Sequence, residues 1–134
     1  MPVAVSEGTV GTGTIAAETL EAHRSYRLSL QGPDGEQATS TAPDLFECLL
    51  LLRDQTDPRG IRLGCNGARR DAWASGMARD MGSGLVVYLL GSVTAAQSRP
   101  PQVATFDPAP LDEIVTADEQ RAWYQSFLAE RRSD

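Results

Sequence analysis

The chain has 134 residues, 41% of them hydrophobic, which is enough for one modest core, and no apolar run approaches the ~18 to 20 residues that span a bilayer. The net charge of −6 argues against a generic nucleic-acid-binding protein and suits docking onto a basic protein. All 12 basic residues are Arg, and five of them lie in residues 61–99 with only two acids, so a net-positive middle separates two net-negative ends.

The start of the chain shows neither the basic region nor the long apolar stretch of a secretory signal, so we expect a cytoplasmic protein. Residues 1–14 are rich in Gly, Thr and Ser and have no sustained amphipathic period. This composition predicts a flexible leader. The remaining residues, 15–134, are predicted to form one α+β domain.

Residues 15–30 fit two local structures. The AAETLEA run has helical propensity, whereas every second residue from Tyr26 to Leu30 is apolar, as in a half-buried strand. The turn residues Gly, Pro, Asp and Gly in 31–36 predict a tight turn, and a second short strand over 36–41 would complete a hairpin.

The clearest helix is predicted over residues 42–55. Thr41 can cap its start, Pro43 is tolerated in the first turn, and Asp44 completes a Thr-x-x-Asp capping box. Apolar residues lie around most of the helix circumference, so we expect this helix to be covered on more than one side.

A last helix is predicted after Thr116, which forms a Thr-x-x-Glu capping box with Glu119. Two pairs of large side chains at helical spacing would anchor it to the core: Trp123 with Phe127, and Tyr124 with Leu128.

Three strands are predicted between the two helices. Ile61, Leu63 and Cys65 alternate with polar residues or glycine, LVVYLL at 85–90 is a continuous apolar run typical of a central strand, and 103–106 can form a short final strand. Together these elements predict an α+β fold in which a small mixed sheet of about four or five strands packs against two main helices.

The two cysteines, Cys48 and Cys65, have neither CxxC spacing nor histidines around them, since His23 is the only histidine. We therefore expect two buried, reduced thiols and no metal site or cofactor. A Cys-His or Ser-His pair would combine His23 with Cys65 or Ser75, and no spacing singles either pair out. We assign no catalytic residue, and an enzymatic role is the less favoured class.

The segment over residues 66–84 concentrates Arg, Asp, Gly and Trp beyond what a structural connection needs. A short helix from Gly76, capped by Ser75, would turn backbone N–H groups outward beside arginines, which suits phosphate, carboxylate or sulfate. The candidate ligand-binding residues are Arg69, Arg70, Asp71, Ser75, Gly76 and Arg79.

Two structural alternatives to this ligand site stay open. The same arginines can form ion pairs that hold a loop over the sheet, Arg69 or Arg70 with Asp71, and Arg79 with Asp80 or Asp44. Trp73 can fill the core instead of forming a binding platform. A reactive pair of Asp71 and Asp80 is also conceivable, but no spacing rule selects it.

The run GIRLGCNGARRDAWASGMARDMGSGLVVYLL, followed by VATFDPAP and the aromatic last helix, resembles a family of short, uncharacterised bacterial proteins. The resemblance covers roughly residues 43–130 and rests mainly on CNGARRD and SGMARDMG. Members of that family tend to be encoded near secretion-associated or polymorphic-toxin loci, which implies an immunity-like or accessory role. The family implies no catalytic residues, and residues 1–20 depart from it.

Three functional hypotheses follow. The first is a protein-binding module, immunity-like or an adaptor, whose acidic surface meets a protein partner such as a basic toxin. The second is a small anionic-ligand-binding or enzymatic domain that uses residues 66–84. The third is a homodimer that pairs through the LVVYLL edge or the Trp123 face.

Overall fold

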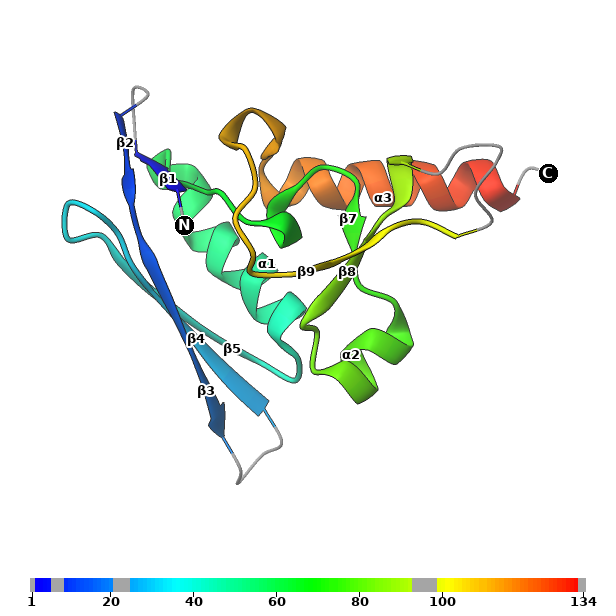
Figure 1. Ribbon diagram of the computed structural model, residues 1–134, viewed down its shortest axis with the longest axis horizontal. Coiled ribbons are helices and arrows are strands. Elements are labelled where there is room, and N and C mark those ends of the chain that lie inside the picture. Colours follow the sequence, from blue (N-terminus) through cyan, green and yellow to red (C-terminus); the bar gives the residue numbers. More distant parts are fainter. Residues whose placement is uncertain (1, 6–8, 21–24, 93–98, 133–134) are drawn as a thin grey trace.

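The computed structural model describes residues 2–5, 9–20, 25–92 and 99–132 (Figure 1). Nine strands in these ranges form three antiparallel sheets of three strands each. The sheets, in spatial order, are β2 (Thr9–Thr12), β1 (Pro2–Val5) and β6 (Arg62–Leu63); β3 (Thr14–Leu20), β4 (Ser25–Gln31) and β5 (Gln37–Ala42); and β7 (Ala72–Trp73), β8 (Val86–Leu89) and β9 (Gln102–Ala104).

The α-helices of the described ranges are α1 (Leu45–Thr56), α2 (Gly76–Gly82) and α3 (Ala117–Arg132). Short 3₁₀ turns connect the elements: η3 (Asp57–Arg59), η4 (Asn66–Ala68), η5 (Leu90–Ser92) and η6 (Leu111–Glu113). The α+β class is confirmed, but the expected single mixed sheet is wrong, because the strands divide among three purely antiparallel sheets. None of the helices in the described ranges is long and apolar enough to cross a membrane.

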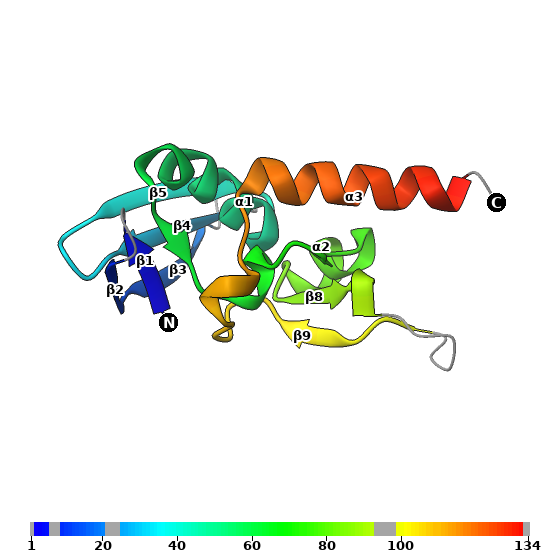
Figure 2. The same cartoon turned by 90° about the horizontal axis from the view of Figure 1, so that it is seen from above.

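The division of the strands among separate sheets follows from the core, because α1 carries apolar residues around most of its circumference. Figures 1 and 2 place α1 between the β3–β5 meander and the β7–β9 sheet. One buried cluster joins Cys48 and Leu49 of α1 to Leu28 of β4, and the other joins Phe46 and Leu50 of α1 to residues of β7 and β8. The prediction that this helix is covered on more than one side is confirmed.

The N-terminal segment differs from the flexible leader that its composition suggested. β1 pairs with both β2 and β6, and Val3 lies opposite Leu63 with no exposed surface. Such short strands carry too weak a periodic signal to be recognised among Gly and Thr. The ambiguous residues 15–30 contain β3 and β4, so in the described part of that range the strand interpretation was right and the helical one wrong.

The helix starts follow local capping chemistry. Residues 41 and 42 belong to β5, so α1 begins later than predicted, and Asp44 rather than Thr41 caps it by accepting a 2.8 Å hydrogen bond from the Glu47 N–H. The capping box of α3 is confirmed, since the Thr116 hydroxyl accepts from the Glu119 N–H at 3.1 Å. Hydrogen bonds from Thr116 lower the pKa of Glu119.

The strands between the helices follow the prediction in part. Ile61, Leu63 and Cys65 are all buried, as their alternation indicated, although only β6 forms a regular ladder there. β8 is the middle strand of its sheet, as expected. It is not fully covered on both faces, because its residues alternate between buried and half-buried, and Leu85 just before it is 49% exposed.

A buried polar network crosses the core. Arg53 of α1 is 1% exposed, and its guanidinium donates to the Gln120 side chain of α3, to the Val115 carbonyl at 2.6 Å and to the Ala68 carbonyl at 3.4 Å. Gln120, also fully buried, donates to the carbonyls of Gly67 at 2.9 Å and Ala72 at 2.7 Å. The network therefore ties α1 and α3 to the segment between η4 and β7.

Cys48 and Cys65 are both free thiols with no exposed surface. Burial raises the pKa of each thiol from 9.0 to about 11. The reactive thiolate form is therefore scarce at neutral pH, and the surrounding core blocks access to both sulfur atoms.

We predict that neither cysteine reacts appreciably with iodoacetamide at neutral pH in the folded protein, whereas both react in denaturant. Mass spectrometry of the labelled chain measures the number of adducts. Fast labelling of the native protein at either position would show that this part of the core is open.

Candidate functional site

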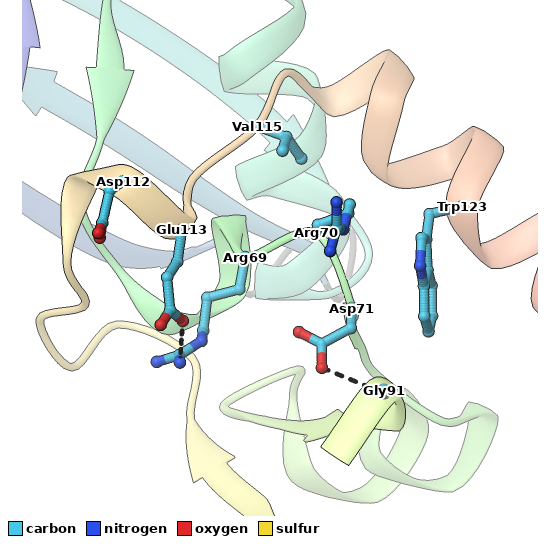
Figure 3. A pocket seen from close by; sticks show the side chains of 8 residues that line it. All are labelled: Arg69, Arg70, Asp71, Gly91, Asp112, Glu113, Val115 and Trp123. Carbon is cyan, nitrogen blue, oxygen red and sulfur yellow. Dashed lines mark hydrogen bonds and ion pairs between the residues drawn. The ribbon is translucent and has the colours of Figure 1, made fainter. Parts of the chain in front are cut away.

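The candidate site is an open pocket of about 570 Å³ where the η4–β7 segment, η6 and α3 meet (Figure 3). Part of the segment over residues 66–84, which the sequence analysis selected, lines this pocket. Residues from η5, η6 and α3 complete the lining. The lining residues are Arg69, Arg70, Asp71, Gly91, Asp112, Glu113, Val115 and Trp123.

The backbone beneath this pocket is held by the buried network. Arg53 binds the carbonyls of Ala68 and Val115, and Gln120 binds the carbonyl of Ala72. These carbonyls lie on either side of the consecutive residues 69–71 and just before α3. Because their hydrogen bonds are buried, the pocket floor is fixed by the core and not by the surface.

The two arginines of the pocket have different roles. Arg69 is half-buried, forms an ion pair with Glu113 of η6 and donates to the Asn66 side chain at 3.2 Å. Arg70 is exposed and has no ion pair or hydrogen bond with any described residue. Arg70 is therefore the cation of this pocket that is available to a ligand.

Asp71 is held in place by hydrogen bonds from two backbone N–H groups. Its carboxylate accepts a 3.1 Å hydrogen bond from the Gly91 N–H (Figure 3). Its main-chain carbonyl accepts from the Leu90 N–H at 2.9 Å. The expected ion pair of Asp71 with Arg69 or Arg70 is wrong, because η6 brings Glu113 to Arg69 instead.

The other three predicted residues lie on a different part of the surface. Ser75 caps α2 as predicted, with its hydroxyl accepting from the Ala78 N–H at 3.1 Å, and the helix begins at Gly76. Arg79 turns from α2 toward α1, where it pairs with Glu47 at 3.1 Å and with Asp44 at 3.7 Å. The structure thus brings together Arg69, Arg70 and Asp71, but not Ser75, Gly76 and Arg79.

Arg79 also packs on aromatic rings. Its guanidinium carbon lies 4.9 Å from the Phe46 ring centre and 5.6 Å from that of Trp73. Trp73 in turn stacks on Tyr124 at 4.2 Å and meets Phe46 edge-on at 5.1 Å. The core-filling role is therefore the observed one for Trp73, and the expected ion pair of Arg79 with Asp44 is confirmed.

Trp123, Asp112 and Glu113 were missed as site residues. Trp123 stacks on Phe127 at 5.5 Å, the predicted i,i+4 pair, and also borders the pocket. Asp112 is exposed and forms no ion pair with the described residues. No local pattern connects these residues with Arg70, because more than forty positions of chain separate them.

The chemistry available in this pocket is recognition by charge and by one aromatic face. Cys65, the possible nucleophile, is fully buried, and His23 lies outside the described residues. Asp80 lies on α2, away from Asp71 in the pocket, so the two do not form an acid/base pair. Within the described ranges no group of three or more His, Cys, Asp or Glu could hold a metal ion.

We predict that Arg79→Ala lowers the free energy of unfolding by about 1 to 2 kcal/mol, because Arg79 joins two carboxylates and two aromatic rings. Arg70→Ala, which removes an exposed arginine that has no partner among the described residues, should change it by less than ~0.5 kcal/mol. Urea unfolding followed by tryptophan fluorescence measures both values. Equal losses would contradict the different roles assigned to these arginines.

Comparison with known proteins adds no relative: no model of a known protein family matches this sequence, and no curated protein matches it either.

Proposed function

We propose that this chain is a protein-binding module, immunity-like or an adaptor, that docks onto a basic surface of a partner protein. The observation that carries the proposal is the way the chain uses its arginines. Most of those with described side chains are engaged within the molecule, the exceptions being the exposed Arg70 and Arg99, whereas several carboxylates are left free at the surface.

Five arginines form ion pairs with the chain's own acids, and two more donate to uncharged acceptors. The ion-paired residues are Arg27, Arg62, Arg69, Arg79 and Arg121, and the other two are Arg53 and Arg59. The exposed acids without an ion pair to a described residue are Asp34, Asp80, Asp107, Asp112, Glu119 and Glu130, of which Glu119 accepts hydrogen bonds from Thr116. An approaching molecule therefore meets mainly free negative charge, in keeping with the net charge of −6.

The acidic segment, residues 107–113, is the part of this surface that best suits a partner. Asp107 and Asp112 are both exposed, and the segment borders the pocket that contains Trp123. The free carboxylate of Asp112 and the aromatic ring of Trp123 line different sides of this pocket (Figure 3), and each favours arginine or lysine, the carboxylate through charge attraction and the ring through cation–π contact. A basic toxin is one partner with this chemistry.

A second candidate function is binding of a small anionic molecule. The observation that favours it is Arg70, which is exposed, lacks a partner among the described residues and lines the 570 Å³ pocket beside Trp123. Asp112 and Asp71 oppose an anion there, so this is the weaker of the two proposals.

We predict that affinity capture from the native cell extract retains one basic protein in stoichiometric amount. The double variant Asp107→Asn, Asp112→Asn should lose it, because the substitutions remove charge and keep size. The matched variant Asp34→Asn, Asp80→Asn removes the same charge elsewhere and should retain it. Retention should also fall as salt is raised, since exposed charges are screened.

Retention of the same protein by both double variants would contradict docking through the acidic segment. Capture of no protein, together with a small anion that native mass spectrometry detects on the wild type and not on Arg70→Ala, would replace the protein-binding proposal with the second candidate.

A further inference from the structure

The two edges of the β3–β4–β5 sheet differ in how far side chains cover their backbone hydrogen-bonding groups. At the β5 edge, the Gln55 side chain donates to the Thr39 carbonyl at 2.8 Å, and Arg59 donates to the Gln37 carbonyl at 3.1 Å. Side chains from α1 and η3 thus occupy acceptors that another strand would need. Such cover is a usual protection of a sheet edge against pairing with a second chain.

The β3 edge has no such cover from the described residues. β3 pairs with β4 along its whole length, from Thr14 opposite Gln31 to Leu20 opposite Ser25, and no described residue donates to or accepts from its outer edge. Its sequence TIAAETL contains neither Pro nor Lys. The single charge, Glu18, pairs with Arg27 of the neighbouring strand at 3.3 Å.

The inner face of β3 borders an open cavity that apolar side chains and two threonines line. Ile15 and Ala17 lie opposite the buried Leu30 and Leu28 of β4, so their side chains share the core-facing side of the sheet. α1 packs on β4 and β5, and Ala17 is left exposed. An open cavity of about 450 Å³ lies here, with Leu28 and Phe106 among its lining residues.

We propose that a second copy of this chain pairs with β3, antiparallel and about a two-fold axis at Ala17. The two three-stranded sheets then form one continuous six-stranded sheet. The cavities on the inner faces of the two β3 strands join into one groove. A closed two-fold dimer leaves neither β3 edge free.

The sequence of β3 suits this register. Ala17 faces Ala17 of the other copy, which allows close approach, and Ala16 faces Glu18. No like charges stand directly opposite each other, a placement that would destabilise the pair. β3 lies on the opposite side of α1 from the β7–β9 sheet (Figure 1).

Two lysine substitutions at adjacent exposed positions test the proposal. Ala17→Lys places two ammonium groups opposite each other in the dimer, on the apolar side, and should raise the dissociation constant roughly tenfold or more. Ala16→Lys adds the same charge one residue away, opposite Glu18 of the other copy, and should leave the dimer intact or tighten it. Sedimentation equilibrium over a range of protein concentrations measures both constants, and circular dichroism confirms that each variant folds.

A wild-type protein that is monomeric at every concentration overturns the proposal. A dimer that Ala17→Lys leaves unchanged, or that both variants weaken equally, also overturns pairing about Ala17. Amide hydrogen exchange gives an independent reading, because dimerisation should slow exchange in residues 14–20 as the concentration rises.

Discussion

The buried guanidinium of Arg53 is the constraint that fixes how α1, α3 and the segment from η4 to β7 pack together. Placing an unpaired cation in an apolar core is costly, so the surrounding backbone has to supply acceptors in the right positions. It does so through carbonyls of Ala68 and Val115 and through the Gln120 side chain. Burial lowers the pKa of Arg53 to about 10, so the group is still charged at neutral pH.

This network connects the core to the candidate site. The carbonyls that Arg53 and Gln120 bind belong to the segment that carries Arg69, Arg70 and Asp71, and to the residues just before α3. Satisfying the buried charge therefore sets both the position of the pocket and the path of the acidic segment beside it. Asp57 strengthens the same junction, because its carboxylate accepts from the Ala117 N–H at 2.7 Å and pairs with Arg62.

The parts of the fold that the sequence predicted correctly are those that local chemistry determines. The Ser75 cap, the Thr116 and Glu119 capping box, and the apolar surround of α1 each depend on residues within a few positions of one another. The Gly- and Thr-rich start was misjudged because β1 is stabilised by pairing with β6, some sixty residues away, and β2 in turn pairs with β1.

The candidate site was predicted only in part, because residues far apart in the sequence come together to form it. Of the predicted ligand-binding residues, Arg69, Arg70 and Asp71 line the pocket, but the long-range partners of Arg69 and Asp71 come from η6 and η5. Arg53 and Gln120 look like ordinary polar helix residues, although Arg53 lies four positions after the buried Leu49 and therefore on a core-facing side. That spacing was the only signal for the network, and it does not reveal which acceptors surround the charge.

A double-mutant cycle with Arg53→Met and Gln120→Leu tests the central role of this network most directly, with the free energy of unfolding measured in urea. Each single substitution should cost about 3 kcal/mol, because it leaves polar groups buried without partners. The double variant should cost less than the sum by at least ~1 kcal/mol, since both members of the pair are gone. Costs that add to within ~0.5 kcal/mol would contradict the account, because they would show that the two side chains act independently.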